Sequence, residues 1–329
     1  MAWRTTASRP EPAVSGREGL DDGSMAEQAA RDLRWQRRLH EERLLHGVSA
    51  EDEANYIGRP EGPAAGVAAE LRRIDPSGLR QISRAVHERC TAAGWRLEHL
   101  GVTIGTVVHG PRLSRAESMS QAEIDTLYAV LLERKVIFFR GQEGLSESEH
   151  IAFARRFGTT EVFPFSVREG AAPEVMPLKS VGPIAGGASG WHSDVTWRKS
   201  PSLGSLLYCE TAPPFGGSTG FVDCYASWQG LPVADREQLR GKWCIHDFDS
   251  FRDGQRSSGV SESTIEEMRT QYPVARHPLV RTHPDTGGEM LYVNPTFGRY
   301  VEESPGVPME ESASNALLQR LYSQSNFPE

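Results

Sequence analysis

The sequence contains no apolar run that is long enough to cross a membrane. Its most apolar stretch, Val136 to Phe139, is closed by Arg140, whereas a membrane-spanning helix needs about 20 apolar residues. The first residues also lack the apolar block of a secretory signal. From these absences we expect a cytoplasmic protein with no membrane partner.

Cysteine and positive charge are scarce as well. The 329 residues include four cysteines, and no two of them are spaced as Cys-x-x-Cys, which argues against a structural zinc site or a disulfide scaffold. A reducing compartment is therefore expected. The 36 Lys and Arg residues are outnumbered by 44 Asp and Glu residues. Nucleic-acid binders usually carry a basic face, so we expect no nucleic-acid partner.

Composition divides the chain into three parts. Residues 1–25 are rich in Gly, Pro, Ser and charge and are predicted to be disordered. Residues 26–95 are predicted to form a helical extension with a linker: a helix over 26–46, a Gly- and Pro-containing stretch, and a short helix near 79–90. This extension is also a candidate oligomerisation arm, which would make the protein a homo-oligomer. Residues 96–329 contain short strands, turn clusters and capped helices.

Local patterns predict the elements of the third part. Two capping boxes, beginning at Ser120 and Ser146, predict helices, and the cluster Pro-Asp-Thr-Gly-Gly at 284–288 predicts a hairpin. Strands are expected at 96–109, 135–139, 205–211, 219–226, 279–283 and 289–293, and a last helix at about 309–323. Short strands with a few helices favour a mainly β fold with decorating helices (α+β), a double-stranded β-helix or jelly roll.

The most informative segment is Trp-His-Ser-Asp-Val-Thr-Trp at 191–197. In an extended segment, residues two apart point to the same side, so His192 and Asp194 can bind one metal ion together. One imidazole, one carboxylate and a second imidazole from elsewhere form the facial triad of non-haem Fe(II) oxygenases, which leaves coordination positions open. The alternative is a surface histidine beside an aspartate that caps a loop.

Five motifs follow one another along the chain: VIFFRGQ (136–142), FARRFG (153–158), WHSDVTW (191–197), PPFGGST (213–219) and HPLVRTHPDTGGEMLYVNPTF (277–297). Together they resemble the TauD/TfdA family of Fe(II)- and 2-oxoglutarate-dependent dioxygenases over residues 96–329. The resemblance implies that His192 and Asp194 bind Fe(II) and that the Thr219 hydroxyl binds a carboxylate of 2-oxoglutarate, with O2 as the oxidant. Taken alone, Thr219 would be an ordinary strand threonine after a turn.

The resemblance also implies a substrate class. The family positions that line the substrate pocket are Val195, Ser250, Phe251 and Phe297. Aromatic walls with one hydroxyl suit a small, partly apolar anion: a sulfonate, a sulfate ester or a carboxylate. The implied reaction hydroxylates this anion and releases succinate and CO2. Taurine itself is disfavoured, because Phe163-Pro164 stands where taurine enzymes carry His-Pro, and 186–190 lacks their Asn.

The family further requires a distal histidine ligand and, beyond it, an arginine that pairs with 2-oxoglutarate. Neither stands at a matching position before Glu329. We therefore expect a C-terminally incomplete domain that lacks its closing strands, binds Fe(II) weakly and does not turn over 2-oxoglutarate. The later histidines, His246, His277 and His283, are better interpreted as structural. The alternative function is a catalytically inactive jelly-roll binding module.

Overall fold

The computed structural model describes residues 3–6, 82–162, 172–178, 190–212, 218–257 and 259–324. Several expectations lie outside these residues: the helix over 26–46, the linker that follows it, Phe163-Pro164 and most of 186–190. None of the helices in the described part of the chain is long and apolar enough to span a bilayer.

The first part of the fold is built around the helix over Gln121–Arg134. Its elements are α4 (Arg84–Ala92), β2 (Arg96–His99), β3 (Thr106–His109), the 3-10 helix η1 (Leu113–Ser118), α5 (Gln121–Arg134), β4 (Ile137–Phe138) and α6 (Glu147–Arg155). The strands form a sheet of order β2-β3-β4. Both predicted capping boxes are confirmed, at Ser120 and Ser146. The buried side of α5, which includes Ile124, Leu127 and Tyr128, forms the centre of the first core.

The second part contains a four-stranded sheet of order β11-β10-β6-β7. Its elements are β5 (Ser218–Phe221), α7 (Cys224–Gln229), α8 (Val233–Leu239), β6 (Trp243–His246), α9 (Asp249–Ser257), α10 (Glu262–Gln271), β7 (Ala275–Pro278), β8 (Val280–Thr282), β9 (Glu289–Leu291), β10 (Gly298–Ser304), β11 (Val307–Pro308) and α11 (Glu311–Ser323). The predicted hairpin is confirmed by the antiparallel pair β8-β9. Helix α11 packs on β10 over a second core that includes Leu318, Leu321 and Val301.

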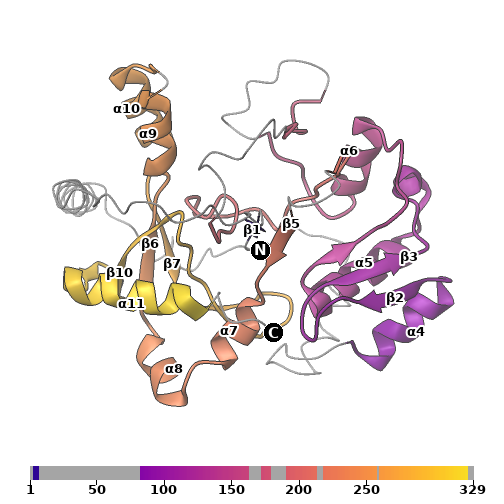
Figure 1. Cartoon of the computed structure of the whole chain (residues 1–329), viewed down its shortest axis with the longest axis horizontal. Helices are drawn as coiled ribbons and strands as arrows, with labels where there is room; N and C mark the ends of the chain where they lie inside the picture. Colours follow the sequence, from indigo (N-terminus) through magenta and orange to yellow (C-terminus); the bar gives the residue numbers. More distant parts are fainter. Residues whose placement is uncertain are drawn as a thin grey trace, which may run out of the picture.

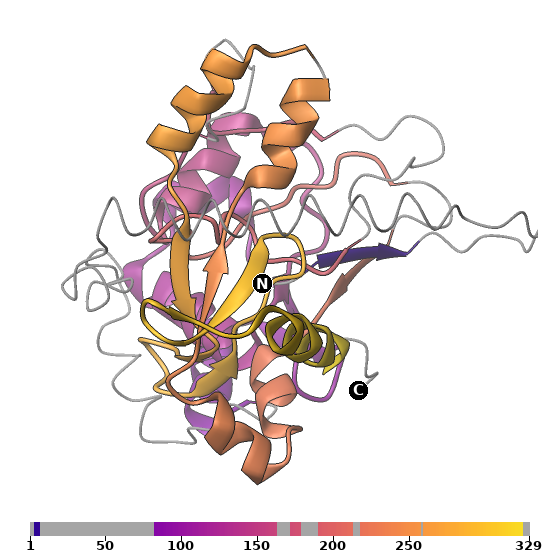
Figure 2. The ribbon, with the colours of Figure 1, turned by 90° about the vertical axis from the view of Figure 1, so that its left-hand side faces the viewer.

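Figures 1 and 2 show how these elements are arranged. The part around α5 lies beside the part that holds β6, β7 and β10 (Figure 1). Helices α9 and α10 project from one end of the four-stranded sheet, and α7 and α8 lie at the other end (Figure 2). Two polar contacts join the parts: Tyr128 donates to Asp285 at 2.6 Å, and Lys135 pairs with the buried Asp223 at 3.0 Å.

Three strand predictions need correction. Residues 205–211 form no strand, and Leu206 and Leu207 are exposed, because strand propensity takes effect only where a partner strand covers the segment. The predicted strand at 219–226 ends at Phe221, since Asp223 accepts hydrogen bonds from the first amides of α7 and so begins that helix. The strand at 135–139 is only two residues long, β4, and is half-buried.

The expected mainly β class is confirmed only in part. Helices α8, α9 and α10 lie where strands were expected to dominate, and the strands of the described residues form separate sheets without a closed barrel. At the other end of the chain, Trp3–Thr6 was assigned by composition to a disordered segment. These residues instead form β1, which pairs antiparallel with β5.

Candidate functional site

The structure brings His192 and Asp194 together. His192 Nε2 lies 3.4 Å from Asp194 Oδ1. The segment that carries them is not extended throughout, as the sequence argument assumed, because residues 194–197 form a turn. The turn directs the carboxylate back toward the imidazole, and both side chains remain partly accessible to solvent.

Each member of the pair is oriented by a second contact. His192 Nδ1 lies 3.0 Å from the carbonyl oxygen of Gly190, and since a carbonyl only accepts, Nδ1 carries the hydrogen. Nε2 is thereby directed at Asp194. The other carboxylate oxygen, Asp194 Oδ2, accepts a hydrogen bond from Ser205 Oγ at 2.8 Å. This contact was not predicted, because Ser205 belongs to a segment that the sequence assigned to a strand.

The pair also changes the acidity of its members. The hydrogen bond with Asp194 raises the pKa of His192 above its ordinary value, against the opposing effect of burial. Burial alone would raise the pKa of Asp194, but hydrogen bonds from His192 and Ser205 lower it below its ordinary value. The pair by itself therefore favours an ionised carboxylate beside a protonated imidazole, and a metal cation would bind the carboxylate and displace the Nε2 proton of His192.

The geometry of the pair fits a shared metal ion. Two donors that each lie about 2.1 Å from an ion and at right angles are about 3.0 Å apart, close to the 3.4 Å observed between His192 and Asp194. A ligating histidine whose other ring nitrogen is held by a carbonyl is the usual arrangement at metal sites. Among the described residues, no third His, Cys, Asp or Glu is grouped with the pair.

The three later histidines have hydrogen bonds of their own. His277 Nε2 lies 2.7 Å from the carbonyl of Thr196, and His246 Nδ1 lies 2.9 Å from the hydroxyl of the same residue. The backbone amide of Asp285 donates to His283 Nδ1 at 3.1 Å. Burial lowers the pKa of His277 to about 4 and that of His246 well below its ordinary value, so both rings are neutral at pH 7.

Comparison with known proteins identifies the family. The model of the "Taurine catabolism dioxygenase TauD, TfdA family" matches residues 96–326. The chain belongs to the TauD/TfdA family. The membership expected from the sequence motifs is thus confirmed.

Curated relatives of the chain come from fungi and bacteria. A Schizosaccharomyces pombe protein named as an alpha-ketoglutarate-dependent sulfonate dioxygenase is 30% identical over 237 residues, which cover 69% of this chain and 56% of that protein. The (S)-phenoxypropionate/alpha-ketoglutarate-dioxygenase of Sphingobium herbicidovorans is 31% identical over 234 residues, or 68% of this chain and 76% of the relative. The chain thus matches little more than half the length of the S. pombe protein.

Solved structures of the TauD/TfdA type share the fold. A taurine dioxygenase from Burkholderia xenovorans has a TM-score of 0.52 and 26% identity, with 71% of this chain and 73% of that chain covered. A second neighbour, AAD-2 in complex with Mn(II) and N-oxalylglycine, has a TM-score of 0.51 and 19% identity, with 71% and 81% covered. This second likeness concerns the fold alone.

Two of the four family substrate positions lie in a packed cluster. Val195 and Phe297 are buried together with Trp197 and Phe248, and the rings of Trp197 and Phe248 are 4.9 Å apart. Val195 and Trp197 belong to the turn that carries Asp194, so the cluster supports this turn from its buried side. Val195 and Phe297 are thus buried as core residues in the structure.

The other two substrate positions, Ser250 and Phe251, lie in α9, and their side chains are outside the described residues. The start of α9 is tied to the end of β6 by Arg252, whose buried guanidinium donates to Asp247 at 2.5 Å and to Asp249 at 2.9 Å. Burial raises the pKa of Asp247, although Arg252 opposes this shift. The ion pair fixes where α9 begins.

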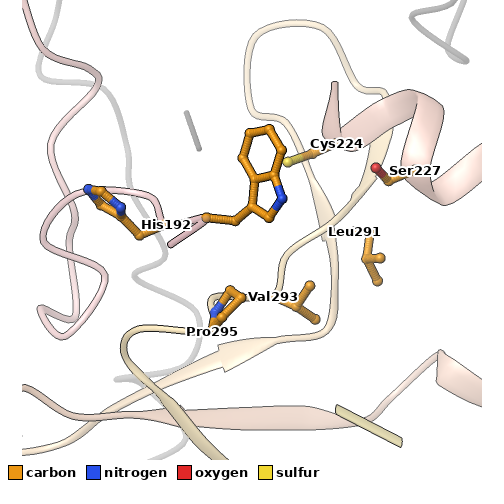
Figure 3. A pocket seen from close by; sticks show the side chains of 7 residues that line it. His192, Cys224, Ser227, Leu291, Val293 and Pro295 are labelled. Carbon is orange, nitrogen blue, oxygen red and sulfur yellow. The ribbon is translucent and has the colours of Figure 1, made fainter. Parts of the chain in front are cut away.

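Thr219, the expected 2-oxoglutarate residue, lies half-buried in β5 opposite Thr5 of β1. The strand leads through Asp223 into α7, which reaches a small cavity beside His192. In Figure 3, Cys224 and Ser227 of α7 lie across this cavity from His192. Trp191, Leu291, Val293 and Pro295 also line this cavity. Thr219 is therefore only a few residues along the chain from Cys224 and Ser227, which line the cavity beside His192.

Proposed function

We propose that the protein is a dioxygenase that couples oxidation of 2-oxoglutarate by O2 to hydroxylation of a small organic anion. One observation carries the proposal: His192 and Asp194 converge to 3.4 Å, each oriented by a second contact, in a chain of the TauD/TfdA family. An imidazole and a carboxylate two positions apart are two of the three donors of the non-haem Fe(II) facial triad.

In this proposal the residues of the chain bind the iron and the 2-oxoglutarate and orient them. His192 and Asp194 hold Fe(II), Ser205 holds the carboxylate in place, and Thr219 donates its hydroxyl to a carboxylate of 2-oxoglutarate. The bound iron supplies the redox chemistry, in which one O2 is consumed while 2-oxoglutarate becomes succinate and CO2 and the substrate gains a hydroxyl group. The carboxylate of Asp194 favours hydroxylation over halogenation, because as an iron ligand it would leave no place for a halide in its stead.

The proposed substrates are sulfonates, sulfate esters and aryloxy- or alkyl-carboxylates. Support comes from the names of the relatives, which include an alpha-ketoglutarate-dependent sulfate ester dioxygenase of Pseudomonas putida and an alpha-ketoglutarate-dependent 2,4-dichlorophenoxyacetate dioxygenase of Cupriavidus pinatubonensis. All of these compounds join a small apolar body to one anionic group. Taurine is not proposed, since Phe163-Pro164 offers no imidazole.

The test begins without O2. Addition of Fe(II) and 2-oxoglutarate to the purified protein should give a weak visible charge-transfer band, and Asp194→Ala should abolish it. O2 and a panel of the three anion classes are then added, and succinate is measured. Because the described residues group only one imidazole and one carboxylate, we expect turnover only where a second imidazole is supplied as the third donor. The test is therefore repeated with free imidazole in solution.

A second candidate function is a binding module without catalysis. It is favoured by one observation, the lack of a third metal donor grouped with the pair among the described residues. This function predicts no charge-transfer band with or without free imidazole, and binding of the small anion that does not change when Asp194 is replaced.

A further inference from the structure

The turn that carries the two proposed ligands contains a strained residue. Val195, directly after Asp194, has a φ of 49°. A β-branched residue in this left-handed region is a rare outlier, and such a conformation persists only where the surroundings hold it. Because Val195 sets the direction of the backbone next to Asp194, whatever holds it also sets where the carboxylate lies.

One buried amide binds the turn on both sides of the strained residue. Asn294 is 1% exposed. Its Nδ2 donates to the carbonyl of Ser193 and to the hydroxyl of Thr196, each at 2.8 Å. The amide orientation follows from its other end, since Oδ1 accepts from the backbone amides of Thr296 at 3.0 Å and Phe297 at 3.3 Å. The two donated bonds therefore bracket Asp194 and Val195 from a segment about a hundred residues away.

Thr196 carries the contact further, into the four-stranded sheet. Its hydroxyl lies 2.9 Å from His246 Nδ1 in β6. Its carbonyl accepts from His277 Nε2 in β7 at 2.7 Å, and the same nitrogen also donates to the carbonyl of Arg198 at 3.1 Å. The rings of His246 and His277 pack edge to face, with centroids 4.9 Å apart. The turn is thus attached to two adjacent strands as well as to Asn294.

We propose that Asn294 and Thr196 are positioning residues for the metal pair. They hold the strained turn against the sheet so that the donor atoms of His192 and Asp194 converge before any ion arrives. A buried network whose members bond one another is rigid, and its loss exposes costly unpaired groups. The inference rests on the proposed function, because it assigns the network a purpose at the proposed metal site.

The test compares three variants. Thr196→Val removes the hydroxyl at nearly constant volume, and Thr196→Ser keeps it. Tyr128→Phe is the matched control, because it removes another buried hydroxyl, the one that donates to Asp285 at 2.6 Å, far from the turn in the sequence. Two readouts are measured: Mn(II) affinity by electron paramagnetic resonance, and amide hydrogen exchange of the peptide 191–198 in the metal-free protein.

The expected result separates Thr196→Val from the other two variants. Its Mn(II) affinity should fall about 10- to 100-fold, as for other groups that orient metal ligands. Exchange of the 191–198 peptide should rise about 10- to 100-fold, because the variant loses the two buried hydrogen bonds of the hydroxyl, with Asn294 and with His246. Thr196→Ser should restore both values to near wild type. Tyr128→Phe should lower the melting temperature without changing either value.

Three results would overturn the inference. These are unchanged exchange of the peptide in Thr196→Val, unchanged Mn(II) affinity in that variant while wild type binds, and equal changes in Tyr128→Phe. Failure of the wild-type protein to bind Mn(II) is a different outcome and contradicts the proposed function. In that case the exchange measurement, which needs no metal, decides the role of the network on its own.

Discussion

The part of the molecule around α5 and the turn that carries His192 and Asp194 are held in different ways. Helix α5 begins at a capping box that closes within four residues, and its apolar face follows helical spacing. The turn is closed locally by a hydrogen bond from the amide of Arg198 to the carbonyl of Val195, but Val195 itself is strained. Its long-range contacts come from Asn294 and from two strands of the sheet. Local sequence thus specifies the scaffold, whereas the site depends on contacts between distant segments.

The largest effect is expected from breaking the scaffold at Arg134. Its buried guanidinium donates to the carbonyls of Gly101, Val102 and Gly105 and to the hydroxyl of Thr106. Arg134→Met should lower the free energy of unfolding by about 3 kcal/mol, since several buried acceptors lose their donor. Urea unfolding measures this loss. Mn(II) affinity of the folded protein should not change, and a parallel fall in affinity would show that the two parts are not separate.

Acid should destabilise the protein through the buried histidines of β6 and β7, the strands that hold the turn. His277 has a pKa of about 4 when folded, below about 6.5 in the unfolded chain, and His246 is lowered in the same direction. The unfolded chain therefore takes up protons that the folded protein does not. The contribution of His277 is full above pH 6.5 and falls by about 1.4 kcal/mol per pH unit as the pH drops toward 4, and His246 adds to the loss in the same direction.

Urea unfolding at pH 7, 6 and 5 measures this slope. His277→Gln, which keeps a donor for the carbonyl of Thr196 but does not titrate, should remove the share of the slope that His277 contributes. A slope equal to that of wild type would show that His277 is not a buried neutral imidazole.

Removal of the Ser205 hydroxyl should affect the site alone. Ser205→Ala frees one oxygen of Asp194 and should weaken Mn(II) binding about tenfold, with little change in stability. Ser202→Ala is the matched control, since its hydroxyl donates to Glu161 at 3.0 Å rather than to the pair. Equal affinity of the two variants would show that Ser205 does not orient the carboxylate.

The smallest effect is expected at a helix cap. Ser120→Ala should lower the free energy of unfolding by about 1 kcal/mol, because the first turn of α5 loses a side-chain acceptor. Metal affinity should stay as in wild type. Thermal unfolding together with the Mn(II) titration checks both statements, and a change in affinity would count against the separation of scaffold and site.

The sequence predicted those elements that are specified by contacts between residues close together in the chain. The capping boxes at Ser120 and Ser146 and the turn cluster at 284–288 each specify an element within a few residues, and all three elements are present. The His-x-Asp spacing likewise brought His192 and Asp194 together as candidates. Their role as metal ligands, the third ligand and the role of Thr219 stay predictions.

What the sequence did not predict depends on partners far along the chain. The strand expected at 205–211 is missing, since propensity alone does not supply a neighbouring strand. The contacts of Asn294 with Ser193 and Thr196 join residues about a hundred positions apart. Asn294 and Thr196 both lie inside motifs noted from the sequence, but only folding shows that they touch.

The central claim is that His192 and Asp194 form a metal site. It is tested most directly by Mn(II) titration of wild type, His192→Ala and Asp194→Ala, with His87→Ala and Asp253→Ala as controls at exposed positions. Mn(II) affinity should fall more than about 100-fold in His192→Ala and in Asp194→Ala, which exceeds the effect of a group that only orients a ligand. The two control variants should bind Mn(II) as wild type does. Equal Mn(II) affinity of Asp194→Ala and wild type would contradict the claim.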